Sequence, residues 1–535
     1  MNNRFLGILL ASLVTIAGGS LFFVTFQNQK ELAESFKILD ARERHEIVPQ
    51  EIKVIEKVVT QQPWGPVQIK AKDTVVQILS QIAEVNILKP YETPQSHAVT
   101  GSGFFISSEG EIITNMHVVD QAKCVWIKIP SLGKAIVEVE VVGRCPERDL
   151  ALLKVTPEGM KTINSALKKI PFLVLGDSDF VNRADEVLAL GYPLSQASLK
   201  STSGVVSGRE HMNGRHYIQV SSPINPGSSG GPAVNIEGEV IGITCAGVMS
   251  AQNVGYIIPV NELKLILSDL RIKQLIKKPY LGVLVSNGGE DLALYAGNPL
   301  PSGCYVVDLY PNGPLDKAGV KAGDMIYEIN KIAIDEFGDL QVPWSEEKIS
   351  FVDYIARWQI GEKVEMLVYR NGKPKQIFFT FGQTDLSPIK KIFVGEDHID
   401  YEIFGGMLLQ PLTLNHVQIL MQIVPTLIKY AEFKNQTEPV LIITHVVPGS
   451  QLDRLSRIRE GCIITHVNNE PVKTMEDFRK VIKHAISKDR IVFKTSEGVV
   501  FVLNTKKLLA EEKKLAQLYH YPISPFMQEL VKEAS

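Results

Sequence analysis

The sequence predicts a mostly β chain in which a β-rich region is followed by two copies of an α+β unit and preceded by an apolar segment. Three observations favour this fold class. Short β-branched segments bounded by Gly, Pro or Ser continue to about Pro259, a motif recurs after about 138 residues, and the 22 residues of segment 5–26 carry no charge. A length of 535 residues favours roughly three to four domains.

The N-terminal segment 5–26 (FLGILLASLVTIAGGSLFFVTF) is long enough for a transmembrane or signal helix. About 20 apolar residues span a bilayer, whereas the apolar part of a signal peptide has about 7 to 15. Two interpretations stay open: an uncleaved signal-anchor, or a signal sequence cleaved near Gly18-Gly19-Ser20. Both export the rest of the chain. Residues 27–72 are rich in charge and are expected to form a stalk.

Composition excludes several classes of protein. The chain has 56 Lys+Arg and 59 Asp+Glu and a net charge of −3, so the basic footprint of a nucleic-acid-binding protein is missing. Five cysteines without a CxxC pair predict neither a disulfide scaffold nor a structural zinc site, and we expect no metal and no cofactor. Cys124 and Cys145 lie in strands joined by a turn, so they form either a disulfide or two thiols.

The domains follow one another in a clear order. Segments such as GSGFFIS, VWIKI, VEVEVVG and ALLKV predict an all-β barrel or sandwich over residues 73–260. Residues 261–278 have apolar side chains at helical spacing and predict a linker helix. Two similar segments, PNGPLDKAGVKAGDMIYEINKIAI and PGSQLDRLSRIREGCIITHVNNEPV, place one domain at 279–385 and a second at 400–506. Residues 507–535 form a charged helical tail.

Three segments of the β-rich region each supply one part of a catalytic site. His117 follows an apolar strand, Asp149 precedes another, and Ser229 lies in the glycine-rich turn NPGSSGGP. A serine hydroxyl becomes a nucleophile when a histidine removes its proton, and a buried aspartate selects the tautomer of that histidine. The order His, Asp, Ser is the order of chymotrypsin-type proteases.

Two alternatives are weaker. The segment GSSGG matches the G-x-S-x-G elbow of α/β-hydrolases, but that elbow needs a helix after the serine and the acid and histidine later in the chain. Here AVNIEGEVIGIT follows, which is a β-hairpin pattern. The neighbouring Ser228 is a less suitable nucleophile because the third residue of the turn GxSGGP occupies the elbow.

The segments TNMHVV, DLALL and NPGSSGGP together resemble the HtrA/Deg family of exported trypsin-like serine proteases, and GSGFFIS, GYPL and TSGVVSG are similar to further segments of that family. The resemblance implies a chymotrypsin-like double β-barrel protease followed by two PDZ domains, located in the periplasm or cell envelope and assembled as trimers or multiples of trimers. It implies unfolded or damaged proteins as substrates. The chain departs from the family at Ser228, where Asn is usual, and at Ser221-Ser222-Pro223.

The same resemblance implies the other site residues. The oxyanion hole falls on Gly227, Ser228 and Ser229, and the primary substrate pocket falls on Ile224, Ala246 and Val248. A pocket without a carboxylate does not offset the desolvation of Lys or Arg, so we expect cleavage after small or medium apolar residues.

The two repeats follow segments similar to the carboxylate-binding loop of PDZ domains. In the first repeat this loop is Tyr280, Leu281, Gly282 and Val283, and it is expected to bind peptide C-termini. The second repeat has FGGML (residues 404–408), for which peptide capture and a structural role both stay open.

The sequence therefore predicts an ATP-independent serine endopeptidase, since no Walker A motif is present. The alternative is a PDZ scaffold or chaperone with little proteolytic activity, and the presence of all three residues of the triad argues against it.

Overall fold

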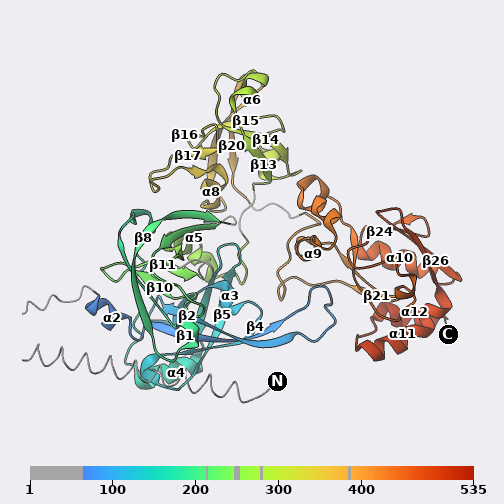
Figure 1. Ribbon diagram of the computed structural model, residues 1–535, viewed down its shortest axis with the longest axis horizontal. Helices are drawn as coiled ribbons and strands as arrows, with labels where there is room; N and C mark the ends of the chain where they lie inside the picture. The colour runs from blue at the N-terminus through green and yellow to red at the C-terminus, as the bar shows by residue number, and fades with distance from the viewer. Residues whose placement is uncertain (1–63, 213–214, 246–252, 278–280, 383–386, 535) are drawn as a thin grey trace, which may run out of the picture. The chain divides into compact units, whose positions relative to one another are not determined.

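The computed structural model describes residues 64–212, 215–245, 253–277, 281–382 and 387–534 (Figure 1). The apolar segment 5–26 and residues 27–63 of the predicted stalk lie outside these residues. In the described part of the chain, no helix has both the length and the apolar character needed to cross a membrane.

Two closed antiparallel barrels form the β-rich region, so the mostly β prediction is confirmed. The first barrel has the strand order β1-β2-β3-β6-β5-β4 and the second has the order β10-β11-β12-β9-β8-β7. The strands of the first barrel are β1 (Val75–Glu84), β2 (Gln95–Phe105), β3 (Glu111–Thr114), β4 (Ala122–Lys128), β5 (Val137–Cys145) and β6 (Leu150–Val155). Those of the second are β7 (Glu186–Gly191), β8 (Lys200–Met212), β9 (Arg215–Val220), β10 (Pro232–Val234), β11 (Val240–Cys245) and β12 (Gly255–Pro259).

Alternation of side chains explains these strands. In β5, Val137 and Val139 are buried while Glu138 and Glu140 are exposed, which is the period of two that a barrel wall requires. A core cluster contains residues of both barrels, including Phe104, Leu152 and Ile243, so the two barrels share apolar packing.

Short helices flank the barrels: α2 (Gly65–Ala71), α3 (Met116–Val119), α4 (Pro157–Ala166) and α5 (Val260–Leu270). Helix α2 precedes the predicted protease boundary at residue 73, yet its Val67 and Ala71 are buried in the core cluster of the barrels. Helix α5 ends at Leu270, whereas the sequence predicts a helix to residue 278. After α5 the chain pairs with Arg144, whose amide donates to Gln274 and whose carbonyl accepts from Ile276, so these backbone groups are not available to a helix.

The first α+β unit is built on a sheet of order β13-β14-β15-β19-β20. Its strands are β13 (Val283–Asn287), β14 (Cys304–Leu309), β15 (Met325–Ile329), β16 (Ile332–Ala333), β19 (Lys363–Arg370) and β20 (Lys373–Thr380), with the separate pair β17 (Asp339–Leu340) and β18 (Ile349–Ser350). Its helices are α6 (Glu290–Tyr295), α7 (Pro314–Lys317) and α8 (Phe351–Ala356). Strand β13 forms one edge of this sheet.

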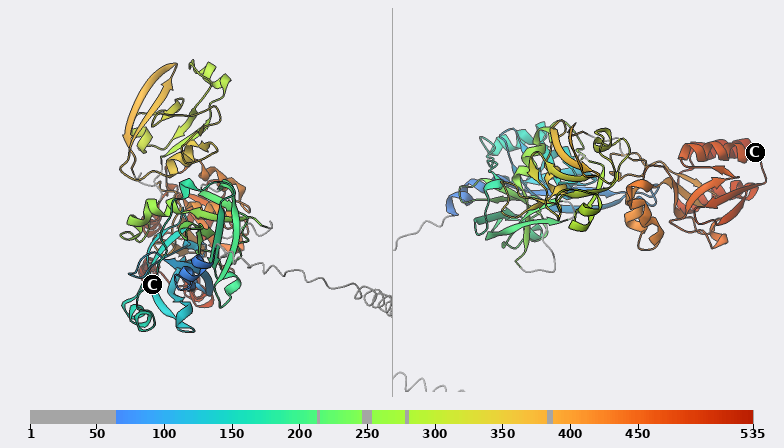
Figure 2. Two further views of the ribbon diagram at one scale, coloured as in Figure 1. Left: turned by 90° about the vertical axis from the view of Figure 1, so that its left-hand side faces the viewer. Right: turned by 90° about the horizontal axis from the view of Figure 1, so that it is seen from above.

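The second unit has the strand order β21-β22-β23-β24-β26-β27. Its elements are β21 (Glu402–Phe404), β22 (Met407–Pro411), α9 (Leu414–Leu420), β23 (Leu441–Val446), β24 (Ile463–Val467), β25 (Glu470–Pro471), α10 (Met475–Ala485), β26 (Arg490–Thr495) and β27 (Val500–Asn504). The tail forms the two helices α11 (Thr505–Tyr519) and α12 (Pro525–Ala534), drawn in red at the C-terminal end of the chain (Figure 2). Their Leu508, Met527 and Leu530 are buried in the core of this unit.

Corresponding residues of the two units have the same structural roles. The amide of Gly323 donates to Val306 and that of Gly461 to Ile443, with φ of 93° and 90° at the two glycines. These left-handed conformations favour glycine. The side chain of Asn330 accepts the amide of Glu365, and in the same way the side chain of Asn468 accepts the amide of Val492. The repeat seen in the sequence is thus a repeat of structure.

Candidate active site

Strand pairing in the first barrel brings the histidine and aspartate segments together. Strands β3 and β6 are paired with Thr114 opposite Ala151. His117 lies three residues after Thr114 in α3, and Asp149 lies two residues before Ala151 in the turn between β5 and β6. Both side chains therefore emerge at the same end of this strand pair.

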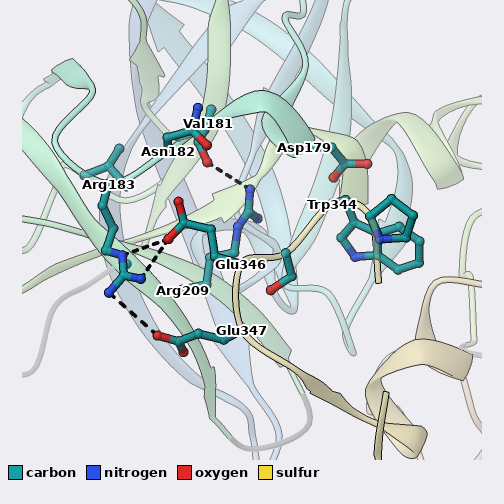
Figure 3. A pocket seen from close by; sticks show the side chains of 12 residues that line it. Asp179, Val181, Asn182, Arg183, Arg209, Trp344, Glu346 and Glu347 are labelled. Atoms are coloured by element: carbon teal, nitrogen blue, oxygen red, sulfur yellow. Dashed lines mark hydrogen bonds and ion pairs between the residues drawn. The ribbon is translucent and has the colours of Figure 1, made fainter. Parts of the chain in front are cut away.

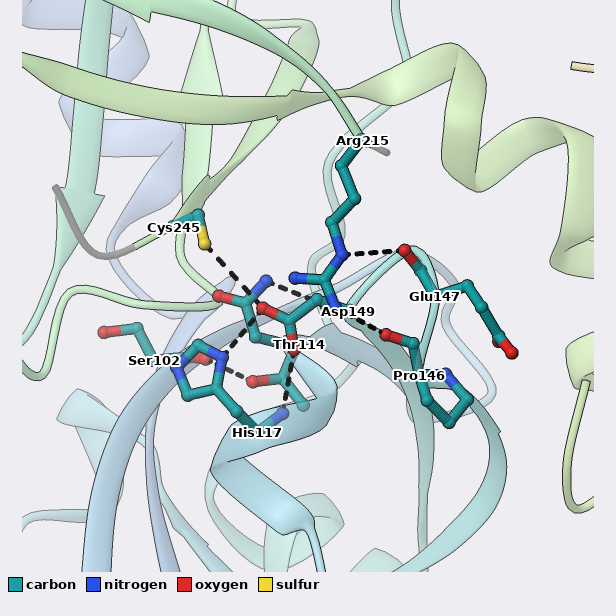
Figure 4. A network of polar contacts seen from close by, with 9 residues as sticks. Ser102, Thr114, His117, Pro146, Glu147, Asp149, Arg215 and Cys245 are labelled. Carbon is teal, nitrogen blue, oxygen red and sulfur yellow. Dashed lines mark hydrogen bonds and ion pairs between the residues drawn. The ribbon is translucent and has the colours of Figure 1, made fainter. Parts of the chain in front are cut away.

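The carboxylate of Asp149 binds His117 twice (Figure 4). Its Oδ1 accepts the main-chain N–H of His117 at 3.0 Å, and its Oδ2 lies 2.8 Å from Nδ1 of the imidazole. Because a carboxylate only accepts, Nδ1 carries the proton and Nε2 presents a lone pair. The Asp149 side chain is 7% exposed and the His117 side chain 45% exposed, so the imidazole has one face toward the aspartate and one toward solvent.

Further donors around Asp149 are not visible in the sequence motifs. Its carbonyl accepts from the side chain of Asn115 at 3.0 Å and from the amide of Met116 at 3.1 Å. The thiol of Cys245 on β11 lies 3.7 Å from Oδ2 and donates to it (Figure 4). Asn115 directly precedes the helix that carries His117. Its position beside His117 is a local signal of a supporting role, and sequence reasoning missed it. Cys245 gives no such signal, because it comes from the second barrel.

Ser229 is buried in the turn between β9 and β10 and lies next to the histidine segment. Its carbonyl accepts the amide of Ser102 at 2.8 Å, and Ser102 in turn accepts the hydroxyl of Thr114 on its carbonyl. Gly230 has φ 88°, and a Cβ there would lie 2.2 Å from the carbonyl oxygen of Ser102, so only glycine fits this close approach.

Within the described residues, no hydrogen bond joins the Ser229 hydroxyl to His117. The structure thus joins His117 to Asp149 and brings the Ser229 turn against the same strands, but leaves the serine–histidine contact open. Such contacts are often long in the absence of substrate and close when substrate binds.

The amides of the serine turn differ in their partners. The amide of Ser228 donates to the carbonyl of Asn225 at 3.0 Å. Neither the amide of Gly227 nor that of Ser229 donates to a main-chain group within the described residues. Two of the three residues predicted for the oxyanion hole, Gly227 and Ser229, thus have N–H groups that are not used by the turn itself.

The other predicted residues are described only in part. Ile224 is half-buried against the second barrel, whereas Ala246 and Val248 lie outside the described residues. Tyr280 also lies outside them, and Leu281, Gly282 and Val283 lead into β13, with φ 66° at Gly282.

Cys124 and Cys145 do not form a disulfide, because Val125 pairs with Val139 in the register of β4 and β5 and Cys145 lies six residues beyond that pair. In the described ranges, no cluster of three or more His, Cys, Asp or Glu side chains is arranged to hold a metal ion.

A separate pocket lies away from these residues (Figure 3). It is lined by Arg183 and Arg209 of the β-rich region and by Trp344 and Glu346 of the segment before α8. Arg183 and Glu346 form an ion pair at 2.8 Å. None of the residues that line this pocket belongs to the candidate active site.

Comparisons with known families agree with this architecture. Residues 101–243 match the model of the trypsin-like peptidase domain, and residues 279–378 and 393–524 each match a model of the PDZ domain. A relative from Brucella suis biovar 1 (strain 1330), "Probable periplasmic serine endoprotease DegP-like", is 30% identical over 406 residues, 74% of this chain and 71% of the relative. A relative of the same description from Marinomonas sp. (strain MWYL1) is 28% identical over 393 residues, 72% of this chain and 74% of the relative.

The solved structure "HtrA-type protease AlgW with decapeptide" is 25% identical, with a TM-score of 0.47, and covers 60% of this chain and 98% of its own. The two barrels and the family matches define the class: a trypsin-like serine endopeptidase that carries two PDZ domains. Within that class, the chain belongs to the HtrA/Deg family, as the identity and coverage of the Brucella relative establish and as the sequence motifs predict.

Proposed function

We propose that this endopeptidase cleaves peptide bonds through an acyl-enzyme formed on Ser229. His117 Nε2 takes the hydroxyl proton as Ser229 Oγ attacks the scissile carbonyl, and it then delivers the proton to the leaving amine. Asp149 holds Nδ1–H and stabilises the imidazolium that forms. The amides of Gly227 and Ser229 stabilise the oxyanion. Water hydrolyses the ester in the second half of the cycle.

One observation carries this proposal. The two-point contact between Asp149 and His117 fixes both the orientation and the tautomer of the imidazole, and leaves Nε2 as the only basic nitrogen. A scaffold protein has no need of such a contact beside a buried serine turn, so we favour the protease over a PDZ scaffold with little activity.

The test is the digestion of dye-labelled casein by the purified chain and two serine variants. Ser229→Ala should lower turnover by about 10⁴-fold or more, because loss of the nucleophile leaves only residual catalysis. Ser228→Ala is the matched control and should keep most of the activity. Turnover that survives in Ser229→Ala but not in Ser228→Ala would move the nucleophile to the neighbouring serine.

The same digests test the predicted substrate pocket. We propose cleavage after small or medium apolar residues, since Ile224 contributes no charge and neither Ala246 nor Val248 carries one. Mapped cleavage sites should be dominated by Val, Ala or Ile, and sites dominated by Lys or Arg would contradict the pocket assignment.

The finer biological assignments are also proposals. The names of the relatives support an exported, periplasmic protein, and the family supports unfolded or damaged proteins as substrates and a trimer or a multiple of trimers. Peptide C-termini are proposed as ligands of the first PDZ domain, and the apolar segment 5–26 as a membrane anchor.

A further inference from the structure

The turn that carries Asp149 has a conformation that needs support. Asp149 has φ 54°, in the left-handed region, where the backbone of a residue with a Cβ is strained. The turn is short: the amide of Asp149 donates to the carbonyl of Pro146 at 3.3 Å, a long hydrogen bond. An aspartate in such a turn keeps its position only if neighbouring groups hold the backbone.

Arg215, the first residue of β9, supplies those groups (Figure 4). Its Nε–H donates to the carbonyl of Glu147 at 2.7 Å, and its Nη2–H donates to the carbonyl of Pro146 at 2.7 Å. One planar guanidinium therefore binds two consecutive carbonyls of the turn, which is a rigid arrangement that an ammonium group does not reproduce. The arginine belongs to the second barrel, whereas the turn belongs to the first.

Arg215 remains a cation in this position. Burial disfavours the charged guanidinium, but contacts with Tyr217 and the negative charge of Asp149 outweigh burial, so the pKa of Arg215 is raised.

We propose that Arg215 is a positioning residue for the triad, which holds the Pro146–Glu147 carbonyls so that both carboxylate oxygens of Asp149 face His117. The inference rests on the proposed roles of His117, Asp149 and Ser229. When Arg215 is removed, the turn relaxes from its left-handed conformation, and the imidazole loses the partner that selects its tautomer. The effect is then on the chemical step and not on substrate binding.

The chain offers a matched control in Arg209 on the adjacent strand β8. Its Nη2 donates to the carbonyls of Ser178 and Val181, so it also holds a loop by arginine–carbonyl bonds. That loop carries no residue of the triad. Arg209→Met therefore removes the same kind of interaction from the same hairpin without a path to Asp149.

The experiment compares Arg215→Met, Arg215→Lys and Arg209→Met in steady-state cleavage of an internally quenched peptide. We expect Arg215→Met to lower kcat by about 10- to 100-fold with KM changed less than about threefold, because small displacements of a catalytic group have such effects. Arg215→Lys, which keeps the charge and one donor nitrogen but not the planar fork, should recover part of the rate. Arg209→Met should stay within about twofold of the wild type.

Two further readouts separate positioning from general damage. The pH profile of kcat/KM should change in Arg215→Met and stay as in the wild type in Arg209→Met, because this profile reports the acid and base groups of the free enzyme and only Arg215 holds the turn that carries Asp149. The low-field proton resonance of His117 Nδ1–H, which needs no turnover, should be weakened or lost in Arg215→Met and retained in Arg209→Met.

The outcomes are distinguishable. Equal rates, pH profiles and resonances in Arg215→Met and Arg209→Met would overturn the inference. If Arg215→Met does not fold, Arg215→Lys decides, and a wild-type kcat and resonance in that variant would also count against it. Full turnover in Ser229→Ala would instead overturn the proposed function, whatever the arginine variants do.

Discussion

Glu512 is a buried carboxyl group in α11 whose surroundings do not support a negative charge. It is 1% exposed, and its Oε1 accepts the hydroxyl of Tyr521 at 3.1 Å, while its Oε2 has no hydrogen-bond partner among the described residues. Burial raises the pKa of Glu512 to about 7, against the hydrogen bond from Tyr521, which lowers it. The nearby charge of Glu402 adds to the increase.

Because the pKa of Glu512 is higher in the folded chain than in the unfolded chain, the free energy of unfolding decreases as the pH rises. Between pH 4.5, the ordinary pKa, and about 7, the folded chain binds more protons at this site than the unfolded chain does. The free energy of unfolding therefore falls as pH rises through this window, and the full cost of about 3 kcal/mol applies above pH 7.

We expect Glu512→Gln to raise the melting temperature of the second PDZ unit at pH 8 and to change it little at pH 4.5. The amide keeps an acceptor for Tyr521 and removes the charge. Thermal unfolding of the full chain, carrying Ser229→Ala to prevent self-digestion, measures both values. The control is Glu511→Gln, a partly exposed neighbour that pairs with Arg454. A gain in Glu512→Gln that is equal at both pH values would contradict this account.

The residues of the candidate site form two groups: those that lie in a short sequence motif, and those that reach the site from a distant part of the sequence. His117, Asp149 and Ser229 are each visible because each occupies a short motif of its own. Arg215 contacts the aspartate turn across 68 residues and Cys245 contacts Asp149 across 96, so neither lies in a motif that names its role. Sequence reasoning predicts the reacting groups, and the packing of the barrels determines which groups hold them in place.

The two PDZ units differ at the strand with which a bound peptide would pair as an additional strand of the sheet. In the first unit, β13 is an edge of the sheet and, within the residues that the structure describes, pairs only with β14. In the second unit, the corresponding β22 is already paired with β21, with Glu402 opposite Leu409 and Phe404 opposite Met407. Gly405 and Gly406 form the turn between these strands, so the segment FGGML closes a hairpin in this domain. This pairing favours a structural role for the second unit.

We expect the full-length Ser229→Ala chain to bind one peptide per chain and not two. The probe is a dye-labelled peptide that ends in an apolar residue with a free carboxylate, measured by fluorescence anisotropy. Its C-terminally amidated twin should bind much more weakly, because the loop amides then have no carboxylate to receive. A stoichiometry of two would show that the second unit captures peptide despite β21.

Two exposed side chains on opposite edges of the first sheet locate the binding strand. Leu284 on β13 is 46% exposed, and Phe378 on β20 is 68% exposed. Leu284→Glu should weaken binding by about tenfold or more, because an acidic side chain on the docking strand repels an anionic peptide end. Phe378→Glu makes the same change on the far edge and should leave binding unchanged. The reverse result would place the peptide on β20.

Sheet edges are the features of these elements that the sequence does not reveal. The motifs YLGV and FGGML have similar positions in the two repeats, but whether a strand edge is open depends on a pairing with another strand. The position at which α5 ends also depends on pairing with a distant strand. The backbone of residues 274 and 276 pairs with Arg144, and this pairing replaces the last turns of the predicted helix.

At the scale of the whole chain, the order of a β-rich region, two repeated units and a helical tail is predictable from composition and repetition. The exact start of the protease is not. Helix α2 is short and contains Pro66, and its place in the fold depends on a few contacts: Val67 and Ala71 are buried in the core cluster, Trp64 packs against it, and Gln68 donates to Ser201. A boundary set by so few side chains gives little signal in a sequence.

The proposal that the apolar segment 5–26 is a membrane anchor makes a prediction about the location of the whole molecule. A bilayer core of about 30 Å needs about 20 helical residues, so the segment is long enough to remain as an anchor, with Arg4 on the non-exported side. We expect full-length protein to resist carbonate extraction and to begin at the original N-terminus.

Two matched variants each add one arginine, one inside the apolar segment and one before it. Val14→Arg places it at the centre, costs about 2.5 to 3.5 kcal/mol of insertion free energy and should release the protein or prevent its export. Asn3→Arg adds the same charge before the apolar residues and should preserve anchoring, because positive charge favours the non-exported side. N-terminal sequencing of membrane and soluble fractions completes the test. A wild-type soluble species that begins near Ser20 would establish a cleaved signal and a freely diffusing protease, whereas an intact N-terminus in the membrane fraction alone supports the anchor.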